Sequence, residues 1–155
     1  MTELHLLPGC RIREITRRDV GSIQIAAEAR LRSGRCPDCG EPSHAVHSRT
    51  VRRPADLPCL GGQVRLELAI RRLYCRNPAC SRQTFVERLP DLIAPRAQRT
   101  DRLAAAQGRV GVALGGKAGA RILQQVGMPT SRLCAAPGPP LASAAPPGSA
   151  GAQRR

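Results

Sequence analysis

The feature that most constrains this chain is a set of four cysteines arranged as two close pairs. Cys36 and Cys39 enclose Pro-Asp, and Cys75 and Cys80 enclose Arg-Asn-Pro-Ala. Two reverse turns of this kind can hold four thiolates at the corners of a tetrahedron, about 2.3 Å from a zinc ion. We therefore predict one structural Zn²⁺ bound by Cys36, Cys39, Cys75 and Cys80, with no open coordination position for catalysis.

Two other uses of these cysteines stay open at this point. Four free or oxidised thiols, or an iron-type redox site, would employ the same residues. His44 and His47 lie beside the first pair as rival ligands, although four cysteines already complete a tetrahedral shell. Cys10, Cys59 and Cys134 have no partner at metal-ligand spacing, and we interpret them as ordinary thiols.

The composition leaves little material for a large hydrophobic core. The chain has 155 residues, and Tyr74 and Phe85 are its only aromatic side chains apart from histidine. This length allows one ordinary domain, or a small one with appendages. A bound metal would add stability that such a core lacks, because metal binding then contributes directly to folding.

The charge is strongly positive, with 25 Lys and Arg against 11 Asp and Glu, a formal net charge of +14. Such a balance indicates a polyanionic partner or a neutralising complex. All of the basic residues except Lys117 are arginine, which suits bidentate phosphate contacts. A GC-rich coding bias would favour the same Arg, Ala, Gly and Pro content, and this alternative stays open.

Short strands are predicted in the first half of the chain. The clearest is residues 64–70, where apolar residues alternate with Arg65 and Glu67, after a turn at Gly61-Gly62. Residues 23–29 and 11–15 are weaker candidates. No apolar run approaches the roughly 18 residues needed to span a bilayer, and the start lacks a secretory leader. These features predict a cytoplasmic protein with no membrane contact.

Helices are predicted after residue 99. Thr100 can cap the first helix, and a second over about 117–126 would place Ala118, Ile122, Leu123 and Val126 on one face. A glycine at 127 follows where a terminator belongs. Five of the 14 prolines fall between residues 137 and 147, which predicts a disordered tail.

The expected fold class is therefore α+β. We predict a β-rich segment at 1–35, a four-cysteine zinc finger at 36–90, a short helical segment at 99–132 and a disordered Ala/Pro/Gly tail at 133–155.

Linked motifs along the chain resemble the N-terminal region of ISL3-family bacterial transposases. In the zinc-finger part these are Cys36-Pro-Asp-Cys39-Gly40, His47-Ser-Arg49, Asp56-Leu-Pro58, Arg71-Arg-Leu-Tyr-Cys75, Asn77-Pro-Ala-Cys80 and Phe85-Val-Glu-Arg-Leu-Pro90. In the helical part they are Arg99-Thr100, Arg102-Leu103, Leu114 to Arg121 and Gly127 to Arg132, which are similar to that family's helix-turn-helix. The resemblance implies binding to transposon ends during DNA transposition.

The chain departs from the family pattern at two places. Cys59 stands where the family commonly has Trp, and after Arg132 the Ala/Pro/Gly tail replaces a Leu-rich helix and a DDE catalytic domain. All 11 acidic residues lie at or before Asp101, so the carboxylate cluster that two-metal phosphoryl transfer needs is not expected. The expected product is a truncated or frameshifted fragment without enzymatic activity.

A DNA-binding fragment of a transposase is therefore the leading function, with double-stranded DNA as partner and phosphate contacts of little sequence discrimination. One alternative is a regulatory protein that pairs with a full-length transposase, and another is a remnant with no function. Each contact residue taken alone is better interpreted as a solvated surface charge, and it is the whole set, with the net charge of +14, that favours DNA affinity. The candidate contacts are Arg49, Arg52, Arg53, Arg71, Arg72, Lys117, Arg121, Ser131 and Arg132.

Overall fold

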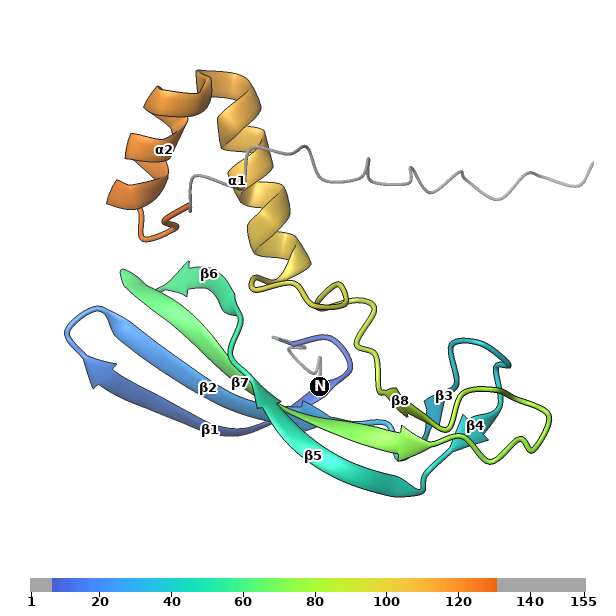
Figure 1. Cartoon of the computed structure of the whole chain (residues 1–155). Helices are drawn as coiled ribbons and strands as arrows, with labels where there is room; N and C mark the ends of the chain where they lie inside the picture. Colours follow the sequence, from blue (N-terminus) through green and yellow to red (C-terminus); the bar gives the residue numbers. More distant parts are fainter. Residues whose placement is uncertain (1–6, 131–155) are drawn as a thin grey trace, which may run out of the picture.

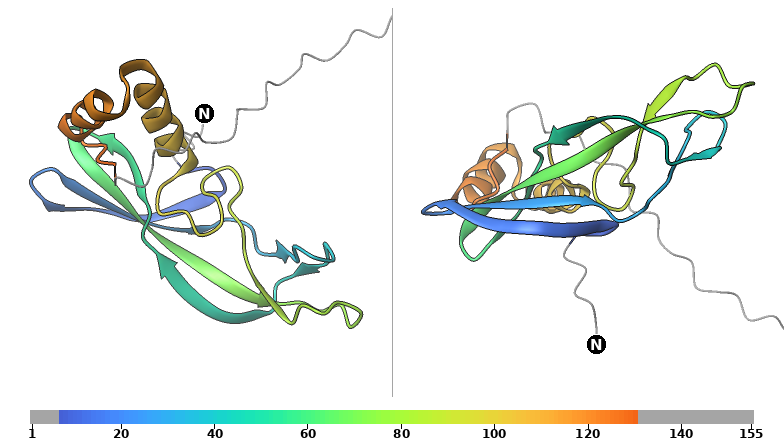
Figure 2. Two further views of the ribbon diagram at one scale, coloured as in Figure 1. Left: turned by 45° about the horizontal axis from the view of Figure 1, so that its top comes forward. Right: turned by 90° about the horizontal axis from the view of Figure 1, so that it is seen from below.

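A twisted sheet forms the body of the protein, and two helices stand over one end of it (Figure 1). The structure is a computed structural model and describes residues 7–130. A two-stranded hairpin, β3 (Gly34–Arg35) and β4 (Pro42–Ser43), lies at the opposite end from the helices (Figures 1 and 2). The mixed α+β class expected from the sequence is confirmed.

The long strand β7 (Gly62–Tyr74) organises the sheet. On one edge it pairs first with β2 (Ser22–Ala29), in parallel, and then with β8 (Thr84–Val86). On the other edge it pairs antiparallel with β6 (Ala55–Cys59) and then β5 (Val46–Arg52). Strand β1 (Cys10–Asp19) adds to β2 in antiparallel pairing. The sheet thus combines strands from both sides of residue 36, where the sequence suggested a boundary between the β-rich segment and the zinc finger.

The strand predicted from the alternation at residues 64–70 lies at the centre of the core. Val64, Leu66, Leu68 and Ile70 are buried, whereas Arg65 is exposed. Leu89, Leu92 and Ile93, from the segment after β8, pack into the same cluster. This cluster contains eleven buried residues and no aromatic ring, so aliphatic packing replaces the anchors that the composition lacks.

The β6–β7 hairpin turns through two residues, Leu60 and Gly61. Both have positive φ, 49° and 73°, and Cys59 pairs with Gly62 across the turn. A two-residue loop with this backbone matches the twist of the flanking strands, and glycine favours it. The turn expected at Gly61-Gly62 therefore lies one residue earlier.

Helix α1 (Asp101–Leu114) begins where the sequence placed its cap. The Thr100 hydroxyl accepts a hydrogen bond from the backbone N–H of Leu103, and Asp101 lies in the first turn. Helix α2 (Gly116–Gln125) is followed by Gly127, which has a positive φ. The backbone N–H groups of Gly127 and Met128 donate to the carbonyls of Gln124 and Leu123. These bonds form the Schellman pattern that terminates helices at glycine.

The apolar face predicted for α2 is only partly buried. Leu123 is buried, whereas Ala118, Ile122 and Val126 are exposed. Gly119 is also buried, and α1 passes so close that a Cβ there would lie 3.3 Å from the Val110 carbonyl oxygen. The two helices therefore contact each other at a small residue rather than along the whole apolar face.

Three expectations fall on the end of the chain. Ser131, Arg132 and the tail at 133–155 lie outside the described residues. Within residues 7–130, neither helix has the length and apolar character that crossing a bilayer requires.

Candidate metal centre and basic surface

The first cysteine pair lies in the turn of the β3–β4 hairpin. The backbone N–H of Cys36 bonds to the Glu41 carbonyl, and that of Gly40 bonds to the Cys36 carbonyl, at 3.0 and 2.9 Å. Gly40 has a φ of 74°, a conformation that glycine adopts at no steric cost. This closed turn directs Cys36 into the interior and leaves Cys39 exposed.

The second pair follows the end of β7 and is shaped by the asparagine and proline within it. The Asn77 side-chain oxygen accepts from the Ala79 N–H at 2.9 Å, and the Cys80 N–H bonds to the Asn77 carbonyl at 3.1 Å. Cys75 remains attached to the sheet through its N–H, which bonds to the Gln83 carbonyl at 2.8 Å. The wider spacing of this pair is taken up by an Asx turn.

The two turns bring the four predicted ligands together. The Sγ atoms of Cys36, Cys39, Cys75 and Cys80 all lie within 4.8 Å of one another, and those of Cys39 and Cys75 are 3.6 Å apart. Sulfur atoms at the corners of a tetrahedral zinc site are about 3.8 Å apart, from Zn–S bonds of about 2.3 Å. Four thiols converging at this spacing fit one structural Zn²⁺.

Comparison with known families agrees with this geometry. The model of the zinc-finger of transposase IS204/IS1001/IS1096/IS1165 matches residues 32–80, which includes all four cysteines. Residues 32–80 are an ISL3-type transposase zinc ribbon. The corresponding comparisons with curated proteins and with solved structures find no match.

A small core of its own supports the ISL3-type ribbon. Cys36, Leu73 and Phe85 are buried together, with Cys75 and Cys80 packed against them. Gly34 is required here, because a Cβ at that position would lie 2.7 Å from a Leu73 methyl carbon. Three buried residues make a minimal cluster, so most of the stability of this lobe depends on the metal.

The two histidines that follow the first cysteine pair lie outside the cysteine cluster. His47 packs edge-on against Tyr74, with ring centroids 5.0 Å apart, and contacts the Ser48 hydroxyl. Within the described residues, neither His44 nor His47 belongs to the cluster of potential metal ligands. Cys10 is a buried core residue, and burial raises the pKa of its thiol to about 11.

Before metal binding, the ribbon thiols shift one another's pKa in opposite directions. Burial raises the pKa of Cys36, but hydrogen bonds from the backbone of Cys39 and Asp38 and from the thiols of Cys39 and Cys75 lower it to about 7. The Asn77 backbone lowers the pKa of Cys75, whereas burial and the neighbouring thiols raise it to about 12. Zinc binds thiolates, so loading the ribbon releases protons.

One predicted phosphate contact is occupied inside the protein. The Arg71 guanidinium donates to the Glu87 carboxylate at 2.6 and 2.9 Å and to the carbonyls of Leu31 and Arg32. The side chains of Arg71 and Glu87 are 18% and 4% exposed. Arg71 therefore attaches the chain before the first cysteine pair to β7, and we no longer count Arg71 among the candidate phosphate contacts.

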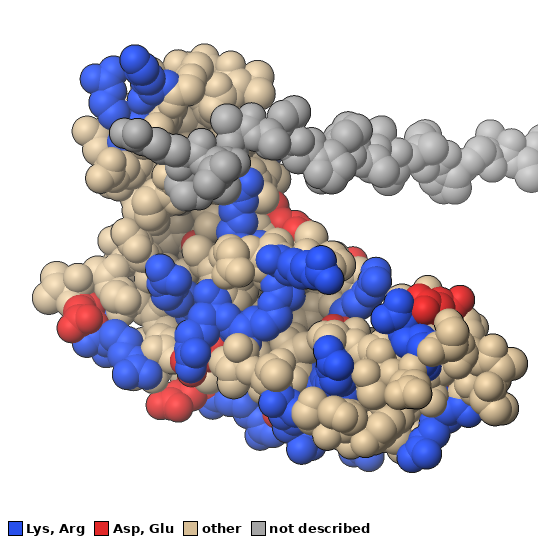
Figure 3. All heavy atoms as spheres, in the orientation of Figure 1, with Lys and Arg blue, Asp and Glu red and all other residues tan. Residues whose placement is uncertain are grey.

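The other described candidates lie on the surface, in two groups. Arg49, Arg53 and Arg72 are exposed around the sheet, and Arg53 pairs with Glu67 at 2.8 Å while its side chain stays 64% exposed. Arg52 is half-buried and donates to the Ala97 carbonyl. Lys117 and Arg121 are exposed on α2. In Figure 3, basic side chains spread over the sheet and helices of one face and outnumber acidic ones.

A buried carboxylate fixes the helices to the sheet. Asp56 on β6 accepts hydrogen bonds from the Thr100 hydroxyl at 2.7 Å and from Arg102, with which it also forms an ion pair. Burial raises the pKa of Asp56, but the bonds from Arg102 and Thr100 outweigh it and lower the pKa. Nothing in the local sequence pattern identified this link, because its members are separated by more than 40 residues.

Proposed function

We propose that this chain binds double-stranded DNA through basic side chains carried by the zinc-ribbon sheet and the helix pair. The observation that carries the proposal is a transposase-type ribbon in a chain of net charge +14. The contacts are electrostatic and read little sequence. They comprise Arg49, Arg52, Arg53, Arg72, Lys117 and Arg121, together with Ser131 and Arg132 outside the described residues.

Helices α1 and α2 supply the first part of a helix-turn-helix in this proposal. Gly115 alone joins them, and the Asp56 network holds the first turn of α1 on β6. In such motifs a recognition helix enters the major groove. The motif is incomplete in this chain, because the Ala/Pro/Gly tail follows Arg132 where the family has a Leu-rich helix.

We further propose that the chain binds DNA without cutting it. Within the described residues, the acidic side chains form no group of three that could hold a metal ion, and the four cysteines are the group that does. Asp38, Asp56, Glu67 and Glu87 instead form ion pairs with arginines. In a bacterial host this role places the protein in the cytoplasm, where the DNA is.

The test is a salt titration of zinc-loaded full-length protein on two labelled duplexes of unrelated sequence. We expect binding whose log affinity falls linearly with log salt, by about 0.9 per phosphate contact, and nearly equal affinity for both duplexes. Absence of binding at low salt would contradict DNA binding. A strong preference for one duplex that persists at high salt would contradict phosphate-dominated binding.

A second candidate function is pairing with another transposase chain. Val112 and Leu114 at the end of α1 and Ile122 and Val126 on α2 are 87%, 50%, 43% and 48% exposed. A contiguous exposed apolar patch is typical of an interaction surface, and these four side chains on adjoining helices are the candidates for one. Light scattering of the purified chain tests the simplest form of this candidate, pairing with a second copy: a dimer that Ile122→Glu dissociates supports it, and a monomer at all concentrations contradicts pairing between copies.

A further inference from the structure

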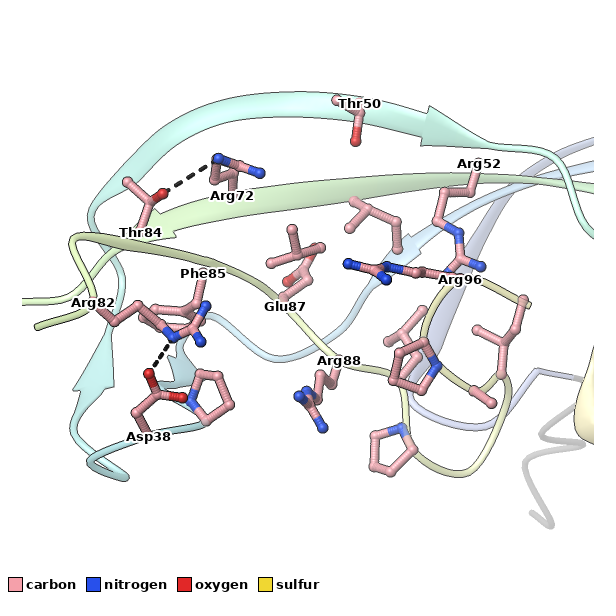
Figure 4. A pocket seen from close by; sticks show the side chains of 18 of the residues that line it. Asp38, Thr50, Arg52, Arg72, Arg82, Thr84, Phe85, Glu87, Arg88 and Arg96 are labelled. Atoms are coloured by element: carbon pink, nitrogen blue, oxygen red, sulfur yellow. Dashed lines mark hydrogen bonds and ion pairs between the residues drawn. The ribbon is translucent and has the colours of Figure 1, made fainter. Parts of the chain in front are cut away.

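A groove rich in arginine runs between the sheet and the segment that follows β8 (Figure 4). Its volume is about 1070 Å³, and one wall is formed by β5 and β7 while residues 86–96 form the other. Its lining combines apolar side chains, such as Ile70, Leu89 and Ile93, with five guanidinium groups. These belong to Arg52, Arg72, Arg82, Arg88 and Arg96.

The acidic residues of the groove are already paired. Asp38 holds Arg82 at 2.6 Å, Glu87 holds Arg71, and Asp101 accepts from the backbone N–H of Ala94 at 3.1 Å. None of the ion pairs within residues 7–130 involves Arg72, Arg88 or Arg96. Arg72 has a neutral partner, the Thr84 hydroxyl at 3.3 Å. Three positive charges therefore remain without an anionic partner in this part of the protein.

Arg96 is held there against its backbone preference. Residues 94–97 form a turn closed by the Ala97 N–H and the Ala94 carbonyl, with Pro95 second and Arg96 third. Arg96 has a φ of 62°, in the left-handed region that the third position of such turns requires. Glycine or asparagine normally occupies that position. A strained residue is a reason to look for a role of its side chain, and the side chain of Arg96 lines the groove.

The chemistry of the groove favours a duplex backbone over unpaired bases. Proteins that bind single strands stack the bases on exposed aromatic rings. Phe85, the aromatic residue in the lining, is buried at 3% exposure and faces the ribbon core. Guanidinium groups without stacking partners bind phosphate oxygens.

We propose that this groove binds the phosphate backbone of double-stranded DNA, with Arg72, Arg88 and Arg96 as the contacting side chains. The proposal rests on the DNA-binding function above and assigns it to one place on the ribbon-bearing sheet. It adds Arg88 and Arg96, which the sequence did not single out, to the contact set. The groove positions the duplex and reads no bases.

The experiment measures duplex binding by fluorescence anisotropy for zinc-loaded full-length variants. Arg88→Gln and Arg96→Gly should each weaken binding about eightfold near 0.1 M salt, which is the counterion contribution of one phosphate contact. The double variant should lower the salt slope by about 2. Arg96→Gly should also keep or raise the unfolding temperature, because glycine relieves the left-handed strain.

Two control variants match these changes elsewhere in the fold. Within residues 7–130, Leu60 is the other non-glycine residue in the left-handed region, and Leu60→Gly makes the same backbone change there. Arg17→Gln removes an exposed charge from β1 at the far edge of the sheet. Both should bind DNA within about twofold of the parent chain, less than the loss of one contact. Equal affinities for the groove and control variants would overturn the groove assignment while leaving DNA binding intact.

Two further outcomes separate the groove from the general function. If the parent chain fails to bind any duplex at low salt, the DNA-binding function itself fails. If the parent chain binds a single strand more tightly than its duplex, and Arg88→Gln weakens that binding most, the groove holds single strands and the proposal is wrong.

Discussion

Asp56 and Thr100, 44 residues apart along the chain, are joined by a hydrogen bond of 2.7 Å from the threonine hydroxyl to a buried carboxylate. The same hydroxyl accepts from the Leu103 N–H, and Arg102 also bonds to Asp56. One side chain therefore caps helix α1 and attaches it to strand β6. The direction of the helix pair relative to the ribbon-bearing sheet follows from this contact.

Replacing Asp56 by Asn should destabilise the fold by about 2 kcal/mol at neutral pH, since it removes a charged acceptor of buried hydrogen bonds. The folded-state pKa of Asp56 is lowered, so its contribution is complete above the unfolded pKa of about 3.9 and disappears as pH falls through the folded value.

Denaturant unfolding of both proteins checks this prediction. Their difference in unfolding free energy should stay constant from about pH 6 to pH 8 and shrink only near pH 4 and below. Because acid also protonates the zinc ligands in both proteins, the comparison uses the difference alone. A difference that changes between pH 6 and 8 would mean that another group is responsible.

The two roles of the Thr100 hydroxyl can be tested by a pair of substitutions. Thr100→Ala should cost about 2 kcal/mol, because the cap and the bond to Asp56 are both lost. Thr100→Ser retains the hydroxyl and should restore most of that stability. Thermal unfolding followed by circular dichroism measures both. Equal losses for Ala and Ser would show that methyl packing, rather than the hydroxyl, stabilises this junction.

Removing zinc should unfold the ribbon lobe and spare the main sheet. The lobe has three buried residues around the cysteines, whereas the main core has eleven. Hydrogen exchange after chelation should therefore show lost protection at residues 34–46 and 74–86 and retained protection in β2 and the first half of β7. Cys80→Ser should reproduce this pattern and lose the metal, whereas Cys59→Ser should bind one zinc as before. Uniform loss of protection would show a single cooperative unit.

Two glycine-to-alanine changes should act in opposite directions. Gly34→Ala places a methyl group 2.7 Å from Leu73 and should destabilise the ribbon lobe by about 1–3 kcal/mol. Gly108→Ala lies in the exposed middle of α1 with open space around the new Cβ and should stabilise by up to about 1 kcal/mol. Chemical denaturation resolves both. A stable Gly34→Ala protein would show that the lobe can shift to accept the methyl group.

The cysteine spacing and the strand alternation were readable from the sequence because both depend on local order. The four predicted ligands lie together, and Val64, Leu66, Leu68 and Ile70 form the buried face of their strand. Thr100 capped its helix for the same reason, since a cap acts within one turn. These elements required no knowledge of what packs against them.

Long-range partners were not readable. The sequence suggested that Arg71 is a surface phosphate contact. In the fold its guanidinium contacts Glu87 and the carbonyls of residues 31 and 32 instead. Ile122 shares the predicted apolar face of its helix with Leu123, but α1 packs at Gly119 and Ile122 is 43% exposed. Pro95-Arg96 was the one local signal of the arginine groove, as a turn dipeptide with a charged residue in the place of glycine.

Strand β1 pairs with β2 and, within the described residues, leaves its other edge open. Such an edge is a template for strand addition by another molecule, and charged side chains are a common protection against it. Arg11, Arg17 and Arg18 are exposed along β1. Glu14 and Asp19 are exposed on the same strand, so the edge carries charges of both signs. We expect these charged side chains to disfavour pairing of β1 with a strand of a second copy, because they would lose water on pairing. Part of the basicity of the chain is thus explained without a ligand.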